Sequence, residues 1–176
     1  MKKIFMAGFG GQGILFMGKF IASAGMLEGY EVTWLPSYGA ESRGGTSNCH
    51  VIVSKTTIGS PIVLEPDILI CMNLPSLNKF ENNLVSGGAL YVDNSIVNRE
   101  TTRSGIKVYS IPATKLAYDN DMDGLANMIM LGAVIKNSNV CDKNTVEKAM
   151  ASAVSATKKD LAAKNIKAIE IGYNYF

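Results

Sequence analysis

The chain has 176 residues, a length that predicts one domain with a sizeable core. Charged residues make up only 18% of it, so we expect part of the surface to meet a partner. The formal net charge is +2 and no run of Lys or Arg exceeds two residues, which argues against a protein that binds nucleic acid. The apolar runs are too short and too often broken by glycine to cross a bilayer, so we expect a cytoplasmic protein that binds no membrane.

The first predicted element is a strand over residues 4–7, which leads through a glycine-rich turn into a helix that should end near Leu27. The candidate binding residues of this turn are Gly8, Gly10, Gly11, Gln12 and Gly13. Such a turn can adopt positive φ and can bring backbone N–H groups close to an anion or to another chain. The glycine spacing matches G-x-G-x-x-G, but a tight crossover in a parallel sheet needs glycine at the same places for purely structural reasons.

A second strand over residues 31–35 completes a βαβ unit. In a dinucleotide-binding unit, an acidic side chain near the end of this strand holds a ribose hydroxyl. Leu35, Pro36 and Ser37 stand at that place, and Glu31 lies at the opposite end of the strand. The sequence therefore argues against ordinary NAD binding.

The polar segment 37–47, with the sequence SYGAESRGGTS, is the second unusual feature. It should leave the sheet at the same edge as the glycine turn, because the carboxyl ends of parallel strands lie together and gather ligands there. Arg43 suits a carboxylate, a phosphate or a facing main chain, although an exposed ion pair with Glu41 in an ordinary surface turn is the alternative. The candidate residues of this segment are Tyr38, Glu41, Arg43, Gly44 and Gly45.

Further strands are expected along the middle of the chain, and polar residues follow two of them. Edge strands are predicted over residues 48–54 and 61–64, and interior or further strands over residues 67–72, 89–92 and 106–111. For Asn73, Asp93 and Asn94, which follow such strands, helix capping and turn formation are preferred over ligand contact.

The last third of the chain is expected to be mainly helical. Residues 125–136 form a pattern that is apolar nearly all round, so this helix should be buried, and its Asn127 must find a hydrogen-bond partner, for which we expect a neighbouring loop. An amphipathic helix is predicted over residues 142–161. The apolar and aromatic tail, residues 166–176, is expected either to pack back onto the domain or to dock onto a partner.

These elements predict an α/β fold in a single domain spanning residues 1–176, with a mostly parallel, open, Rossmann-like sheet of six or seven strands and helices on both faces. Cys49, Cys71 and Cys141 are far apart and have no C-x-x-C spacing, so we expect buried thiols and neither a disulfide framework nor a metal or cluster site. His50, the single histidine, is expected to be packed rather than catalytic.

Three segments together resemble the gamma subunit of 2-oxoacid:ferredoxin oxidoreductases. They are GFGGQGI at residues 8–14, SYGAESRGG at 37–45 and NMIMLGA at 127–133. The resemblance covers almost the whole chain and is strongest to the separate gamma subunit of 2-oxoglutarate or branched-chain 2-oxoacid enzymes, because the chain ends without a fused ferredoxin or thiamine domain. A pyruvate enzyme is a further alternative.

The resemblance implies a complex that decarboxylates a 2-oxoacid on magnesium and thiamine diphosphate, passes electrons through iron–sulfur clusters to ferredoxin, and delivers the acyl group to coenzyme A. The partners would be the alpha and beta subunits, with a ferredoxin-like delta subunit as a further candidate. No residue of this chain receives a catalytic role, and its glycine loops either border the coenzyme A or thiamine diphosphate region or pack only on protein. An independent nucleotide-binding protein and a homodimer of the isolated chain remain as alternatives.

Overall fold

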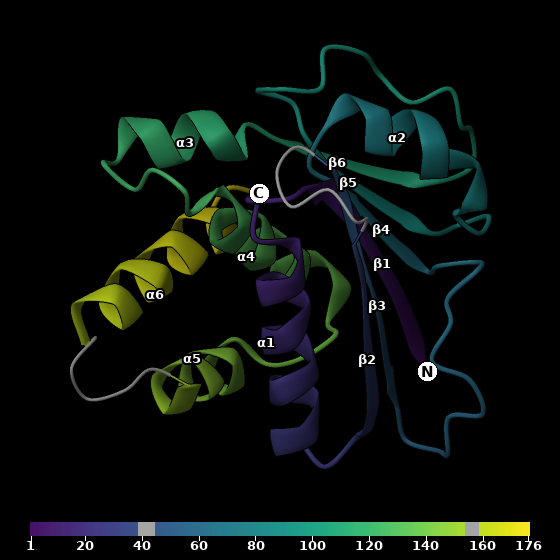
Figure 1. Ribbon diagram of the computed structural model, residues 1–176, viewed down its shortest axis with the longest axis horizontal. Coiled ribbons are helices and arrows are strands. Elements are labelled where there is room, and N and C mark those ends of the chain that lie inside the picture. The colour runs from purple at the N-terminus through teal and green to yellow at the C-terminus, as the bar shows by residue number, and fades with distance from the viewer. Residues whose placement is uncertain (39–44, 154–158) are drawn as a thin grey trace.

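The computed structural model describes residues 1–38, 45–153 and 159–176. All the described strands lie in the first two thirds of the chain, together with the first helices, and helices alone make up the last third (Figure 1). In chain order the elements are β1 (Lys2–Phe9), α1 (Ile14–Leu27), β2 (Glu31–Tyr38), β3 (Thr46–Ser54), β4 (Ile68–Cys71), α2 (Leu74–Phe80), the 3₁₀ helix η1 (Glu81–Asn83), β5 (Ala89–Asp93), β6 (Lys107–Ile111), α3 (Ala113–Asp119), α4 (Ala126–Ser138), α5 (Lys143–Ala153) and α6 (Lys159–Tyr173).

The six strands form one sheet in the order β2-β3-β1-β4-β5-β6, which confirms the predicted α/β fold. Strands β1, β4, β5 and β6 are parallel neighbours, whereas β3 runs antiparallel to both β1 and β2. Because two antiparallel pairings restore the direction, β2 runs the same way as β1. The predicted βαβ unit is therefore present, but β3 is inserted between its two strands.

Two strand predictions were wrong. The strand predicted at an edge over residues 48–54 is the interior strand β3, and it is buried there because Cys49, Val51 and Val53 pack beneath α1. Residues 61–64 form no strand and belong to the connection between β3 and β4. A side chain holds that connection in place of strand pairing, because the N–H of Val63 donates a hydrogen bond to Nδ1 of His50 at 3.0 Å.

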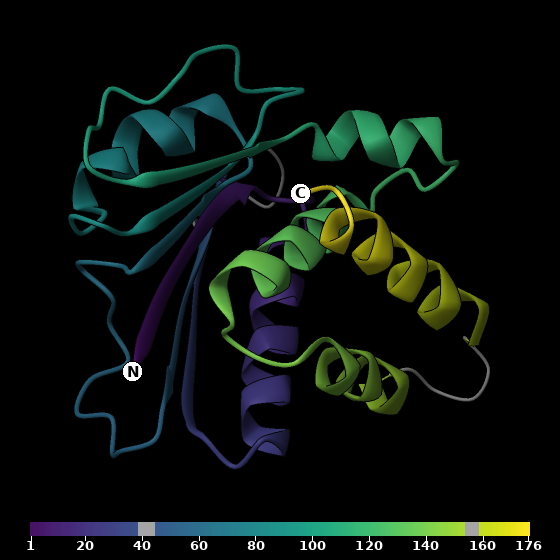
Figure 2. The same cartoon turned by 180° about the vertical axis from the view of Figure 1, so that it is seen from behind.

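Helices cover both faces of the sheet, as predicted. Helices α1, α4, α5 and α6 lie on one face and α2 lies on the other, which Figures 1 and 2 show from opposite sides. Each face has its own apolar core, and the larger one lies beneath α1 and α4. Within the described ranges, no helix combines the length and the apolar character that a membrane span requires.

The C-terminal region packs back onto the domain. Leu161 belongs to α6 and not to the predicted helix 142–161, whose observed part is α5. Helix α6 crosses α4 at very short range, because a Cβ on Gly132 would collide with the backbone of Ile169. The ring of Phe176 then meets the ring of Tyr109 on β6 edge to face, with centroids 5.5 Å apart.

Candidate functional site

The turn between β1 and α1 has the backbone geometry that its glycines predict. Gly11 has φ +97° and Gly13 has φ +72°, both in the left-handed region that favours glycine. Gly11 is exposed, and Gly13 precedes the first turn of α1, which has neither a side-chain cap nor an acidic residue. In the described part of the chain the N–H groups of Gly11 and Gly13 have no acceptor. These donors, at the positive end of the helix dipole, suit an anion or a carbonyl oxygen.

Gln12 joins the ends of two neighbouring strands. Its Oε1 accepts hydrogen bonds from the N–H of Phe9 at 2.7 Å and from Nδ2 of Asn73 at 3.1 Å. Its Nε2 donates to the carbonyl oxygen of Met72, just beyond β4, at 2.8 Å. Gly8 leaves room for this amide, because a Cβ there would lie 2.7 Å from Oε1 of Gln12. The polar atoms of Gln12 are thus engaged inside the protein.

The Gln12 amide lies between two neighbouring strands from which the chain leaves toward opposite faces of the sheet. The chain leaves β1 for α1 on one face and leaves β4 for α2 on the other face (Figure 1). In open α/β sheets the crevice at such a switch between neighbouring strands is where nucleotides bind. Here the side chain of Gln12 bridges the crevice, and no acidic residue stands at the end of β2. The geometry therefore argues against the independent nucleotide-binding protein.

The second predicted segment meets the first. The N–H of Gly10 donates to the carbonyl oxygen of Gly45 at 3.0 Å, and Ser47 pairs with Gly8 on one side and Tyr38 on the other. This confirms that both segments lie at the same edge of the sheet. Three candidate residues, Glu41, Arg43 and Gly44, lie outside the described residues, and Tyr38 is placed by its backbone alone.

Asn127 ties helix α4 to the glycine turn. Its Nδ2 donates to the carbonyl oxygen of Gly13 at 3.2 Å, and a Cβ on Gly13 would collide with the Asn127 side chain. The residue is 4% exposed, and its Oδ1 has no partner in the described part of the chain. The predicted bond to a neighbouring loop is confirmed, and that loop is the glycine turn itself.

Asn73, which follows β4, and Asp93, the last residue of β5, serve in capping and turn formation, as the sequence predicts. Oδ1 of Asn73 accepts from the N–H of Ser76 at 2.9 Å. Asp93 is fully buried and accepts from the N–H of Ser95 at 3.0 Å and from both the N–H and the hydroxyl of Thr114, at 3.0 and 2.6 Å. Asp93 thereby fixes the start of α3 near the glycine turn. The sequence does not reveal this connection.

Sequence reasoning missed a hollow beside the glycine turn. It has a volume of about 300 Å³, and its walls come from the turn, from α3 and from the residues that precede α4. The residues that line it include Gly11, Gln12, Ile96, Thr114, Tyr118 and Asp123. No motif marks it, because its walls come from segments more than one hundred residues apart.

The cysteines and the histidine have structural environments. Burial raises the pKa of Cys49 and of Cys141 to about 12 and raises that of Cys71 as well, so these thiols stay protonated at neutral pH. His50 packs against the edge of Phe5, and burial lowers its pKa. Across residues 1–38, 45–153 and 159–176, no three His, Cys, Asp or Glu side chains gather as metal ligands.

A family model for the pyruvate ferredoxin/flavodoxin oxidoreductases matches residues 3–175. The chain belongs to this oxidoreductase family. The 2-oxoglutarate synthase subunit KorC of Methanocaldococcus jannaschii is 34% identical over 175 residues, which cover 98% of this chain and 92% of that subunit. The ketoisovalerate oxidoreductase subunit VorA of Methanothermobacter thermautotrophicus is 38% identical over 133 residues, but these cover 76% of this chain and only 28% of VorA.

Solved structures of the same oxidoreductase family share the fold. The gamma subunit of the keto/oxoacid ferredoxin oxidoreductase from Geobacter sulfurreducens superposes with a TM-score of 0.84 and 27% identity, over 98% of this chain and 96% of that one. The 2-oxoglutarate:ferredoxin oxidoreductase of Magnetococcus marinus, solved with 2-oxoglutarate, coenzyme A and succinyl-CoA bound, gives a TM-score of 0.88 and 25% identity. The matched region covers 98% of this chain but only 31% of that chain. The predicted gamma-type oxidoreductase subunit is confirmed.

Proposed function

We propose that this chain is the gamma subunit of a 2-oxoglutarate:ferredoxin oxidoreductase, which converts 2-oxoglutarate and coenzyme A to succinyl-CoA and CO2 and passes the electrons to ferredoxin. The observation that carries the proposal is the match to the KorC subunit over almost the full length of both chains. The partners would be alpha and beta subunits that hold magnesium and thiamine diphosphate, together with a ferredoxin-like delta subunit that carries iron–sulfur clusters. The complex would work in the cytoplasm.

In this proposal the chain contributes no catalytic residue, and its glycine loops border the coenzyme A or thiamine diphosphate region. The support is geometric: the N–H groups of Gly11 and Gly13 have no acceptor in the described residues, and the first turn of α1 has no acid that would repel an anion. A diphosphate fits such donors, and so does the main chain of a partner subunit. Arg43 would add a cation at the same edge, which stays a prediction.

A branched-chain 2-oxoacid enzyme is the second candidate. Its support is the 38% identity to VorA, which exceeds the identity to KorC but covers a shorter stretch. Substrate choice would lie with the subunits that hold thiamine diphosphate, so this chain alone does not decide between the two. A pyruvate enzyme is a third candidate, because the pyruvate synthase subunit PorC of Methanocaldococcus jannaschii is 30% identical over 179 residues.

The deciding experiment is an anaerobic pull-down of the tagged chain from its native cells, with identification of the partners and a viologen-reduction assay on the eluate. Coenzyme A-dependent reduction with 2-oxoglutarate, and not with branched-chain oxoacids or pyruvate, would support the 2-oxoglutarate subunit. Reduction with branched-chain oxoacids or with pyruvate, and not with 2-oxoglutarate, would instead select the corresponding enzyme. Recovery of the chain alone, in cells whose intact complex is detectable by activity, would contradict the subunit assignment.

A further inference from the structure

The hollow beside the glycine turn has a fixed shape. Its α3 wall is held by Asp93, which accepts two hydrogen bonds from Thr114 at the start of that helix. The same carboxylate accepts from Ser95, and the carbonyl oxygen of Asp93 accepts from the N–H of Ile96, so the opposite wall is held as well. On the third side, Asn127 holds the glycine turn. A hollow with such walls is ready to receive a group without rearrangement.

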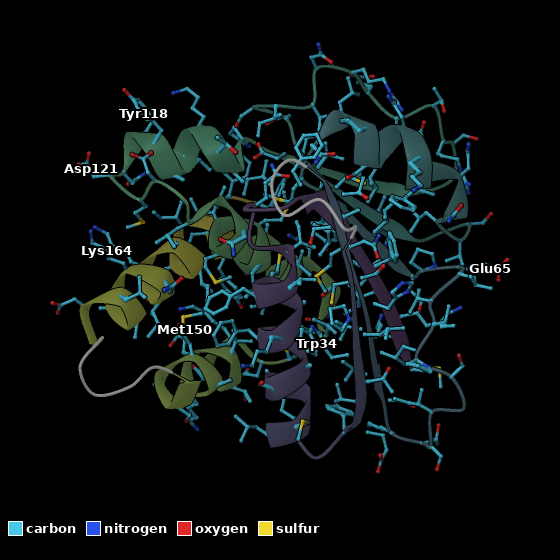
Figure 3. The ribbon with its side chains drawn as sticks, viewed as in Figure 1. Trp34, Glu65, Tyr118, Asp121, Met150 and Lys164 are labelled. Carbon is cyan, nitrogen blue, oxygen red and sulfur yellow. The ribbon has the colours of Figure 1, made fainter. Side chains whose placement is uncertain are left out.

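The rim of the hollow is apolar where it is most exposed. Tyr118 is 73% exposed and Ile96 is 40% exposed, and both line the hollow. Figure 3 shows Tyr118 projecting outward from the far end of α3, away from the core. Large exposed apolar side chains around a preformed hollow are typical of a protein interface, in which a side chain of the partner enters the hollow as an anchor.

The rim is also acidic. Asp123 lines the hollow and Asp121 lies two residues before it, whereas Asp119 is paired with Lys115. Asp121 and Asp123 are exposed, and Figure 3 shows Asp121 projecting from the turn after α3. This negative charge repels a phosphate-bearing cofactor and attracts a basic segment.

We propose that this hollow, bounded by Ile96, Tyr118 and Asp123, is a docking site for a basic segment of a partner subunit that inserts one apolar side chain. The inference rests on the proposed function, since it assumes an assembled oxidoreductase. Because Gly11 also lines this hollow, its N–H group would meet the main chain of the partner rather than an anion. A volume of about 300 Å³ is enough for one large side chain and its neighbours, but small for a whole cofactor.

The test compares variants in the complex recovered by the anaerobic pull-down. In one variant Tyr118→Ser removes the apolar rim, and in another Asp123→Lys reverses the charge of the carboxylate that lines the hollow. The matched controls are Leu64→Ser and Glu65→Lys, because Leu64 is also 73% exposed and Glu65 lies on the far side of the molecule in Figure 3. The positions changed, which are Tyr118, Asp123, Leu64 and Glu65, are all exposed, so the fold should survive, and thermal unfolding of each variant checks this.

We expect each hollow variant to retain partner subunits at least about tenfold less than the wild type and the controls, as loss of an interface anchor costs more than ~1.4 kcal/mol. Raising the salt from about 0.1 M to about 1 M should weaken partner retention by the wild type and should not weaken it for the charge-reversed variant, because salt screens the repulsion in that variant. Retention equal to the wild type in both hollow variants would overturn the docking site and leave the proposed function standing. A wild-type chain that retains no partner would overturn both.

A photo-crosslinker identifies the occupant. The chain with Tyr118→p-benzoylphenylalanine is irradiated in the complex, with Leu64→p-benzoylphenylalanine as the control at equal exposure. We expect position 118, and not position 64, to crosslink to a partner peptide that contains Lys or Arg next to a large apolar residue. A crosslink from position 118 to a second copy of this chain would overturn the proposed occupant in favour of self-association.

Discussion

Gln12 and Met72 lie 60 residues apart, and a hydrogen bond of 2.8 Å from Nε2 of Gln12 to the carbonyl oxygen of Met72 joins the carboxyl ends of β1 and β4. The same side chain holds the glycine turn through Phe9 and the start of α2 through Asn73. One amide therefore connects the three segments that define this edge of the sheet. The glycines around it give the turn its shape, and Gln12 fixes that shape against the neighbouring strand.

The first prediction concerns this amide. Gln12→Ala should lower the free energy of unfolding by about 1–3 kcal/mol, because it removes partners from Phe9, Met72 and Asn73. Gln12→Glu is the matched variant: it keeps an acceptor for Phe9 and Asn73 but places a carboxylate oxygen against the carbonyl oxygen of Met72, so it should also be less stable than the wild type. Urea unfolding of the isolated chain measures both. A Gln12→Ala chain as stable as the wild type would show that the bridge is not stabilising.

The second prediction distinguishes backbone strain within the glycine turn from a clash with a partner or ligand that approaches the turn. Gly11→Ala and Gly11→Val share the strain of φ +97° and find open space within the described chain. Gly11→Ala should therefore lose about 1–2 kcal/mol of stability and the β-branched Gly11→Val somewhat more, which unfolding of the isolated chains measures. In the complex, the branched side chain of Gly11→Val should clash with a partner or a ligand at close approach and reduce assembly or turnover well below that of Gly11→Ala. Equal assembly and turnover for the two variants would mean that nothing approaches Gly11 closely.

The sequence predicts this edge of the molecule only in part. The glycine spacing and the polar segment identify the two loops, because turn chemistry is local and glycine has a direct steric cause. The partners of Gln12 and Asn127 are not predictable in this way. Asn127 reaches Gly13 across 114 residues, so the contact depends on how α4 packs against the sheet. The insertion of β3 between β1 and β2 also leaves no local signal, since a buried interior strand and a half-buried edge strand both read as short apolar runs.

Glu81 is a structural carboxylate that the sequence does not reveal. It is 5% exposed and accepts hydrogen bonds from the guanidinium of Arg99 and from Thr101 and Thr102, so it fixes the connection between β5 and β6. Burial alone would raise its pKa, but these hydrogen bonds and the charge of Arg99 outweigh burial and lower the pKa from 4.5 to about 2. Nothing near Glu81 in the sequence distinguishes it from the exposed Glu100, because its partners come from a distant loop.

The lowered pKa of Glu81 predicts how stability depends on pH. Between its folded pKa of about 2 and its unfolded value of 4.5, the unfolded chain binds more protons, so stability is fully present above pH 4.5 and is lost as the pH falls toward 2. The difference corresponds to about 3 kcal/mol. Glu81→Gln should remove most of this contribution to the pH dependence, whereas Glu100→Gln, at an exposed position, should keep the wild-type profile. Urea unfolding from pH 7 down to pH 3 measures it, and identical profiles for wild type and Glu81→Gln would contradict the assignment.

The crossing of α4 and α6 depends on two glycines. A Cβ on Gly132 would collide with the backbone of Ile169, and a Cβ on Gly172 would collide with the backbone of Ile129. Backbone atoms cannot turn aside as a flexible side chain can, so Gly132→Ala and Gly172→Ala should each force the helices apart. We expect a loss of about 1–3 kcal/mol in the free energy of unfolding, the usual cost of overpacking.

Gly59→Ala is the matched control for this crossing, because a Cβ on Gly59 meets nothing within 4 Å and its φ is not in the left-handed region. That variant should be neutral or slightly more stable, since alanine restricts the unfolded chain. If Gly132→Ala and Gly172→Ala unfold at the same urea concentration as Gly59→Ala, the helices do not approach as closely as the structure shows. If they unfold earlier, the close approach of α4 and α6 is supported, and with it the packing of α6 onto the domain.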